Sequence, residues 1–155
     1  MITKETLEDS LDTHISDHCE QGMTADNLNH CAHYVSHELG YEFGYQCGNQ
    51  TDSAGEGSTI RVQEVFARCP EVGLWADKPA ALKKCLAFIT KKTNVDLKRR
   101  VMSNVPRKHI GIFCDGHIYH YSNSRDKVVK QTPDQFSRHY SGTGYAVFYG
   151  KFVTT

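Results

Sequence analysis

The chain has 155 residues, and its 18 Lys and Arg residues balance its 18 Asp and Glu residues. A chain of this length buries roughly two-thirds of its unfolded surface, so we expect residues 1–155 to form a single domain without disulfide or metal staples. Because the net charge is neutral, the chain has no overall electrostatic field that favours the binding of nucleic acid. No run approaches the roughly 18 apolar residues of a transmembrane helix, so no membrane span is expected.

The N-terminus is acidic and amphipathic, and it lacks the basic, apolar and small-residue segments of a signal peptide. We therefore expect synthesis in the cytoplasm, with export by a secretion machine as a route to the periplasm. The six cysteines are widely spaced and include no CxxC pair, which favours free thiols over a disulfide framework.

A first helix is predicted in the N-terminal segment, residues 1–22. Apolar residues recur there every four positions. They are Leu7, Leu11, Ile15 and Cys19. This spacing places them on one face of a helix, which we expect to end near Gly22.

The next segment, residues 26–69, is predicted to hold the helix that carries Cys31, followed by a long loop. Asp26 and Asn27 are candidate caps for the start of this helix, and Gly40 is typical of its end. Cys31 would then lie near the end of the first helical turn.

The loop is predicted over residues 41–58, which are rich in Gly, Asn, Gln and Ser and show no period. A short amphipathic helix around Val65 should follow. It is expected to end at Cys69, because the backbone of a residue before a proline disfavours the helical region.

The C-terminal part, residues 85–153, changes to β-branched and aromatic runs of strand length. These runs are residues 85–90, 109–113, 117–122 and 145–153, with a short edge strand at 127–130. Asp115-Gly116 is a hairpin signal between the second and third runs. Helices followed by antiparallel strands predict an α+β domain, with the N-terminal helices packed on the C-terminal sheet.

The segment between the first two runs, residues 91–108, is basic. Its basic residues are Lys91, Lys92, Lys98, Arg99, Arg100, Arg107 and Lys108. The segment is interpreted as a solvated loop or, alternatively, as a basic wall that receives a carboxylate-bearing substrate.

Cys31 is the cysteine whose neighbourhood predicts a reactive thiol. A positive helix terminus and an adjacent imidazole are what a nucleophilic cysteine needs. His109 opens a predicted strand and is the candidate base. His120 is the candidate for the group that orients it, since the hairpin brings the two histidines side by side, and Ser122 or Asn123 are alternatives.

Two stretches carry a resemblance to the NlpC/P60 and CHAP peptidases, which are papain-like enzymes. The first is Asn29-His30-Cys31-Ala32-His33-Tyr34-Val35, which resembles their nucleophile helix. The second is His109-Ile110-Gly111-Ile112-Phe113 with residues 115–122, which is similar to their signature of a catalytic His strand followed by a polar strand. Two features depart from the family: Asp-Cys-Ser-Gly of the NlpC/P60 group is His30-Cys31-Ala32-His33 here, and residues 91–108 are longer than the common connection.

The resemblance implies a papain-like NlpC/P60 fold and a cysteine peptidase or amidase. Cys31 would be the nucleophile, His109 the general base and acid, and His120 the orienting residue. The implied substrate is a peptidoglycan stem peptide, hydrolysed through a thioester in cell wall degradation. The small size resembles amidase effectors delivered by type VI secretion, a class of bacterial toxin, or a small phage lytic enzyme. Such an effector implies a partner immunity protein or inhibitor; we expect a monomer and no cofactor or metal.

Three alternatives remain open at this point. A papain-like acyltransferase or deamidase acting on a protein would use the same triad. A non-catalytic binding module would keep the fold without needing the thiol. A zinc protein would use the histidines and the cysteine crowded on one predicted helix, where His33 and His37 are four residues apart. Its candidate ligands are His30, Cys31, His33 and His37.

Overall fold

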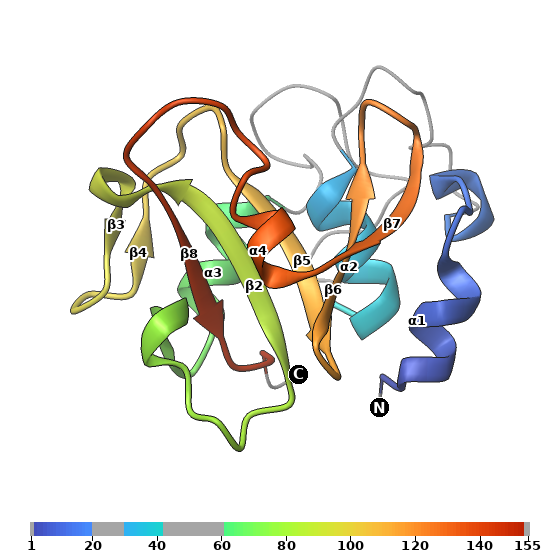
Figure 1. Ribbon diagram of the computed structural model, residues 1–155, viewed down its shortest axis with the longest axis horizontal. Helices are drawn as coiled ribbons and strands as arrows, with labels where there is room; N and C mark the ends of the chain where they lie inside the picture. The colour runs from blue at the N-terminus through green and yellow to red at the C-terminus, as the bar shows by residue number, and fades with distance from the viewer. Residues whose placement is uncertain (1, 20–29, 42–60, 154–155) are drawn as a thin grey trace.

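The computed structural model describes residues 2–19, 30–41 and 61–153 (Figure 1). These residues form an α+β structure, as predicted. Its helices are α1 (Lys4–Ser10), α2 (Cys31–Leu39), α3 (Val62–Arg68) and α4 (Pro133–Phe136), with 3-10 turns at Ile15–Asp17, Trp75–Asp77 and Lys92–Asn94. None of the described helices is long and apolar enough to cross a membrane.

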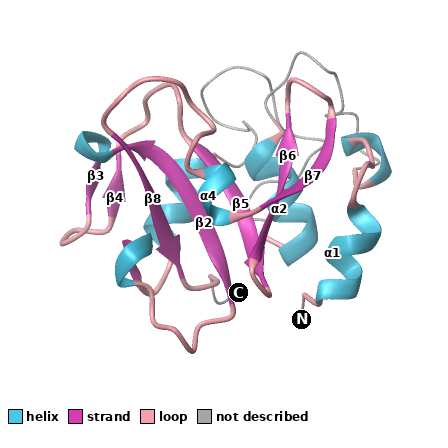
Figure 2. Ribbon diagram, in the orientation of Figure 1, coloured by secondary structure: helices cyan, strands magenta, loops and turns pink. Residues whose placement is uncertain are grey.

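The described strands form a six-stranded antiparallel sheet in the order β1-β8-β2-β5-β6-β7 and a separate two-stranded sheet (Figure 2). The large sheet comprises β1 (Val72–Leu74), β2 (Lys84–Lys91), β5 (His109–Cys114), β6 (His117–Ser122), β7 (Lys127–Gln131) and β8 (Tyr145–Gly150). The small sheet pairs β3 (Val95–Asp96) with β4 (Val101–Met102).

Several chain reversals follow the predicted local chemistry. Asp115 and Gly116 both have positive φ, 52° and 88°, as a two-residue type I′ hairpin requires. Gly40 ends α2 in the left-handed region, with φ 73°. Thr132 and Gln135 form a reciprocal capping box at the start of α4. The predicted hairpin and helix end are therefore confirmed.

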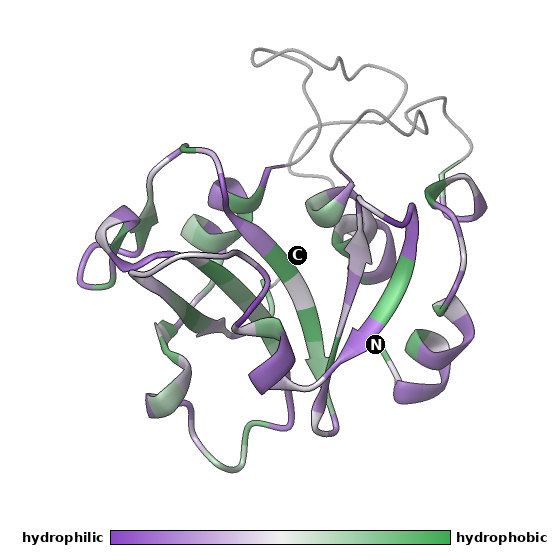
Figure 3. Ribbon diagram, turned by 45° about the horizontal axis from the view of Figure 1, so that its top comes forward, coloured by the Kyte–Doolittle hydropathy of each residue, from purple (hydrophilic) through white to green (hydrophobic). Residues whose placement is uncertain are grey.

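The two faces of the large sheet bury different sets of side chains. Ile110 and Tyr119 face the cluster that includes α2, whereas Phe113 and Ile118 face a second cluster that includes Phe136 of α4. The alternation follows from the two-residue period of a strand. Accordingly, α2 lies behind the sheet and α4 in front of it in Figure 1, and hydrophobic segments run along the strands in Figure 3.

The sheet opens between β5 and β6. Their pairing ends at Ile112 and Tyr119, although β5 pairs with β2 as far as His109 and β6 pairs with β7 as far as Ser122. The two strands meet at the hairpin and diverge from there, as Figure 1 shows. The start of β5 therefore faces a gap in the ladder, and Cys31 and His109 both lie at this end of the structure.

The first helix is shorter than predicted. The helix α1 ends at Ser10, and Asp12 takes a left-handed backbone with φ 64°. The amide of Asp12 donates to the carbonyl of Val128, and the amide of Val128 donates to the carbonyl of Thr13, each at 3.0 Å. Strand β7 lies at the edge of the sheet, where its backbone groups need partners. The segment after α1 therefore makes hydrogen bonds to β7 in place of further helical ones. Three of the four stripe residues, Leu7, Ile15 and Cys19, are nevertheless buried.

The predicted start of the second helix is also wrong. The helix α2 begins at Cys31, and His30 is the N-cap residue without a side-chain capping bond. Cys31 is therefore the first helical residue and does not close the first turn. The candidate caps Asp26 and Asn27 lie outside the described residues, as does nearly all of the predicted loop at 41–58. The short helix α3 ends before Cys69, as predicted.

The basic segment 91–108 is more ordered than the predicted loop. It holds a 3-10 turn and the small sheet of β3 and β4. Arg100 donates to the carbonyl of Pro70 at 3.0 Å, and Lys108 donates to the carbonyl of Val105 at 2.7 Å. Strand β1 was not predicted, because three residues are too few for a period to show.

Candidate functional site

Cys31 lies at the N-terminus of α2, buried between this helix and the sheet. Its thiol receives hydrogen bonds from the backbone N–H groups of Ala32 and Ile110. The Ile110 N–H belongs to the peptide unit that joins His109 to Ile110, at the gap between β5 and β6. The sulfur therefore lies against the backbone of the predicted base.

The electrostatics of the thiol are dominated by burial, which raises the pKa of Cys31 to about 11. The backbone N–H groups of Ala32, Ile110 and Cys31 itself and the positive charge of Lys108 lower this pKa. The resting thiol is consequently protonated at neutral pH, and the groups that would stabilise a thiolate are already beside it.

A chain of hydrogen bonds leads from His109 across the gap. His109 Nε2 lies 2.8 Å from His120 Nδ1, and His120 Nε2 lies 2.7 Å from the side-chain oxygen of Gln131. Gln131 on β7 pairs with Ile118 on β6. This register places Gln131 diagonally from His120 on the same face of the sheet. The structure therefore brings His109 and His120 together, and adds Gln131 behind them.

This chain determines where the protons lie on the neutral rings. With the Gln131 oxygen as acceptor, His120 donates from Nε2, so its Nδ1 accepts from His109 Nε2–H. The lone pair of His109 is then on Nδ1, and an imidazole with a lone pair can act as a base.

His139 adds a second contact to the predicted base. Its ring stacks on that of His109, with centroids 4.1 Å apart and planes inclined by 4°. Burial first, then the charges of His120 and His139, hold the pKa of His109 well below its usual 6.5. Burial likewise lowers the pKa of His120 to about 4. Both rings are therefore neutral at pH 7.

Gly111 allows β6 to approach the start of β5. A Cβ atom at this position would lie 2.6 Å from a methyl carbon of Ile118 and 3.0 Å from both His120 Cβ and the Tyr119 carbonyl oxygen. Because Gly111 faces the same side of the sheet as His109, the missing side chain leaves the space that His120 occupies.

The two alternatives for the orienting residue make other contacts. Asn123 accepts a hydrogen bond from the backbone N–H of His30 at 2.9 Å, and Ser122 lies 3.2 Å from the hydroxyl of Ser124. The side chain bonded to His109 is therefore that of His120. Asn123 instead attaches β6 to the residue before Cys31.

Two groups of side chains among the described residues could hold a metal ion, each with ligand atoms within 4.8 Å of one another. We call them the His109 cluster (His109, His120 and His139) and the Cys19 cluster (Cys19, His33 and His37). Of the predicted zinc ligands, the second group retains His33 and His37 and includes Cys19 where Cys31 was predicted. His30 lies beside it, with its Nδ1 3.2 Å from that of His33.

Ring orientation argues against an ion in the His109 cluster. An imidazole binds a metal along its nitrogen lone pair, which lies in the plane of the ring. The planes of His109 and His139 are parallel within 4°, so they share no line on which an ion lies in both. The stacked pair suits a base better than a metal site.

Sequence reasoning missed three residues near the thiol and the imidazole. Lys108 appeared only as part of a basic run, although its place next to His109 puts it on the α2 face of β5 by strand alternation. Gln131 follows the short predicted edge strand at 127–130. His139 is exposed and carries no sequence signal of its own. Comparison with protein-family models, curated proteins and solved structures finds no match to this chain.

Proposed function

We propose that this protein is a cysteine hydrolase with a papain-like arrangement, in which Cys31 is the nucleophile and His109 the base. The observation that carries the proposal is the position of the Cys31 sulfur, at a helix N-terminus and against the peptide unit between His109 and Ile110. The order of a cysteine helix, a histidine strand and a polar strand in the antiparallel sheet also supports it.

The acylation step transfers one proton and exchanges one bond. For this step the His109 ring, which lies on the α4 face of the sheet, must reach the Cys31 sulfur through the gap between β5 and β6. The Cys31 thiol then loses its proton to His109 Nδ1 while the sulfur attacks the carbonyl carbon of an amide. The tetrahedral intermediate then expels the amine, which takes the proton from His109, and leaves a thioester on Cys31. Water attacks the thioester with His109 again accepting a proton, and the products are a carboxylic acid and the free thiol.

The surroundings of Cys31 supply the electrostatic part of this mechanism. The N-terminus of α2 carries the positive end of the helix dipole, which can stabilise an oxyanion. Lys108 provides positive charge beside the developing thiolate. Because the pKa of the resting thiol is about 11, deprotonation accompanies attack instead of preceding it.

The orienting role is assigned to His120, with Gln131 as a positioning residue behind it. Their hydrogen bonds place the proton of neutral His109 on Nε2 and the lone pair on Nδ1. When His109 takes the thiol proton, the resulting positive charge is stabilised by the same chain.

The proposed substrate is a peptidoglycan stem peptide, on the basis of the resemblance at Cys31 and at His109-Ile110-Gly111. A cavity of about 610 Å³ opens on the α4 side of the sheet, lined in part by Trp75, Pro133 and Val147. It lies on the face of the sheet that carries the His109 ring, and its lining residues do not include Cys31, His109 or His120. Delivery as a secreted antibacterial effector, with an immunity protein in the producing cell, completes this proposal.

The test is digestion of purified peptidoglycan by the full-length protein and two matched variants. Cys31→Ser should abolish the release of new amino groups, whereas Cys85→Ser, the same change at another buried thiol, should retain it. Circular dichroism should show that both variants are folded. Undiminished activity in Cys31→Ser would overturn the proposal. Activity on a protein glutamine or amine acceptor instead of peptidoglycan would support the deamidase or acyltransferase alternative.

A further inference from the structure

We propose that the Cys19 cluster binds a transition-metal ion, with Zn²⁺ the best fit, and that the ion joins the N-terminal segment to α2. The site is separate from the proposed hydrolytic residues, and its ligands are Cys19 Sγ and the Nε2 atoms of His33 and His37. Imidazole and thiolate are the ligands that Zn²⁺ prefers.

The distances suit a tetrahedral ion. The Nε2 atoms of His33 and His37 lie 3.0 Å apart, and all three ligand atoms are within 4.8 Å of one another. With metal bonds of about 2.0 Å to nitrogen and 2.3 Å to sulfur, tetrahedral ligands are separated by roughly 3.3 to 3.6 Å. Changes of up to roughly 1.3 Å in the separations of the ligand atoms therefore complete the arrangement.

The ring planes suit it as well. The rings of His33 and His37 are inclined by 47°, so their planes cross and an ion can lie in both. The two residues are four apart on α2, which places them on one face of the helix. The parallel rings of the His109 cluster lack this property.

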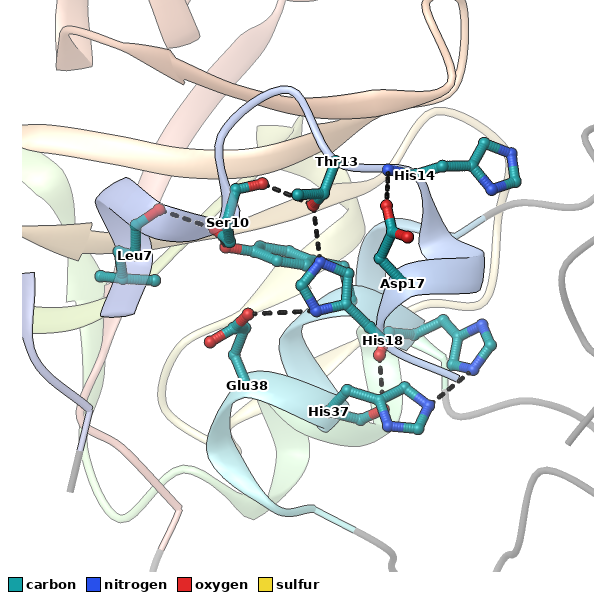
Figure 4. Close-up of polar contacts among 11 residues, drawn as sticks. Leu7, Ser10, Thr13, His14, Asp17, His18, His37 and Glu38 are labelled. Carbon is teal, nitrogen blue, oxygen red and sulfur yellow. Dashed lines mark hydrogen bonds and ion pairs between the residues drawn. The ribbon is translucent and has the colours of Figure 1, made fainter. Parts of the chain in front are cut away.

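A second layer of polar groups surrounds the ligands. His33 Nδ1 lies 3.2 Å from His30 Nδ1, so the ring of His33 is held with Nε2 directed at His37. Such outer contacts fix the orientation of metal-binding histidines. His18 precedes Cys19 and lies between Thr13 and the carboxylate of Glu38, as Figure 4 shows, with distances of 2.7 and 3.4 Å.

Because the site is buried, its ligands must neutralise part of the charge of the metal ion. Cys19 and His33 are 3 % and 2 % exposed. A buried divalent cation is costly unless negative charge accompanies it. The Cys19 thiolate supplies one negative charge directly, and the Glu38 carboxylate lies beyond His18. Three of the ligands come from the described residues.

The ion would reinforce existing contacts between the same two segments. The Ser10 hydroxyl lies 2.9 Å from the hydroxyl of Tyr34 on α2, and His18 packs edge-on against the Tyr34 ring. Cys19 comes at the end of the described N-terminal segment. A bond from Cys19 to α2 therefore fastens that end beside the helix that carries Cys31.

The test is a titration of the metal-free full-length protein with Co²⁺, which reports a cysteine ligand by a thiolate-to-cobalt charge-transfer band. We expect one equivalent to bind, Zn²⁺ to displace it, and Zn²⁺ to raise the Tm by several degrees. Cys19→Ser should lose the charge-transfer band. Cys31→Ser is the matched change at another buried thiol and should keep the band.

His37→Gln provides the second variant, because its side chain is only half-buried and the substitution is less disruptive to folding. It should weaken Co²⁺ binding by more than the ~10–100-fold typical of losing an outer-layer contact. The proposal is overturned if the wild type binds no Co²⁺, if His37→Gln binds it with unchanged affinity, or if the band depends on Cys31. None of these results changes the peptidoglycan test of Cys31, so the two proposals fail separately.

Discussion

The His109 cluster and the Cys19 cluster both bring three potential ligands within 4.8 Å, but their rings are arranged differently. In the His109 cluster two rings are parallel and stacked, and the hydrogen bonds lead outward from His109 to Gln131. In the Cys19 cluster two rings are inclined by 47° and their Nε2 atoms lie 3.0 Å apart.

Both clusters contain histidines, so under these proposals ring orientation, and not residue type alone, separates a base from a metal ligand set. A histidine whose Nε2 proton is held by a chain of acceptors has a lone pair on the other nitrogen for a proton. Two histidines whose lone-pair directions converge have a place for a cation. The contrast between a base and a ligand set is therefore open to direct test.

The sharpest test exchanges one histidine in each cluster for glutamine. His109→Gln should lower peptidoglycan hydrolysis by ~10²–10⁴-fold, the contribution typical of a general base, and should leave Co²⁺ affinity unchanged. His37→Gln should weaken Co²⁺ binding and should leave peptidoglycan hydrolysis unchanged. Turnover and Co²⁺ titration on both variants measure this, with His117→Gln on the same hairpin as a control. Loss of both properties in either variant would contradict the separation of the two clusters.

A smaller effect is expected from Gly111→Ala, which acts on the spacing of the His109 cluster. The added Cβ would meet Ile118, His120 and the Tyr119 carbonyl, so β6 must move away from the start of β5. We expect destabilisation of about 1–3 kcal/mol, typical of overpacking, and a partial loss of hydrolysis as the 2.8 Å contact of His109 with His120 lengthens.

Gly116→Ala is the matched control for this change. Gly116 has positive φ and nothing within 4 Å of an added Cβ, so the substitution strains the turn of the same hairpin without crowding His120. Urea denaturation and turnover separate the two effects. If Gly116→Ala reduces hydrolysis as much as Gly111→Ala does, the spacing argument is wrong.

The smallest expected effect is a dependence of stability on pH. Burial lowers the pKa of His120 from 6.5 to about 4 in the folded protein, so the unfolded chain binds more protons between these values. The contribution to the free energy of unfolding is therefore complete above about pH 6.5 and is lost as pH falls toward about 4. The lowered pKa of His109 acts in the same direction.

Urea midpoints of the wild type and of His120→Gln, measured between pH 7.5 and pH 4.5, isolate the His120 contribution. The wild type should lose more stability over this range than the variant. Equal losses would show that His120 is not held neutral by the fold.

Much of the local structure could be predicted from the sequence, because its causes lie within a few residues. Asp115-Gly116 favours a type I′ turn since both residues tolerate positive φ, and Gly40 ends α2 for the same reason. Pro70 stops α3 sterically, and Thr132 caps α4 through its own side chain. His109 and His120 were paired correctly because the hairpin that joins them is itself a local feature.

The sequence could not show which distant segments meet. Strand β8 pairs between β1 and β2, far from its neighbours along the chain, because burial of both sheet faces determines the order of strands. The break of α1 at Asp12 depends in the same way on the edge of β7. A period of four residues alone indicates a helix, and it carries no information on what lies beside it.

The residues themselves thus determined the thiol, the histidine strand and the hairpin that brings His120 to His109. Tertiary structure decided the rest: the gap beside β5 where the Cys31 sulfur lies, the stacking of His139, the support from Gln131, and the meeting of Cys19 with His33 and His37. The reason is physical, since turn and cap preferences act through neighbouring dihedral angles and hydrogen bonds, whereas ring planes and ligand distances are set by the packing of segments far apart in the chain.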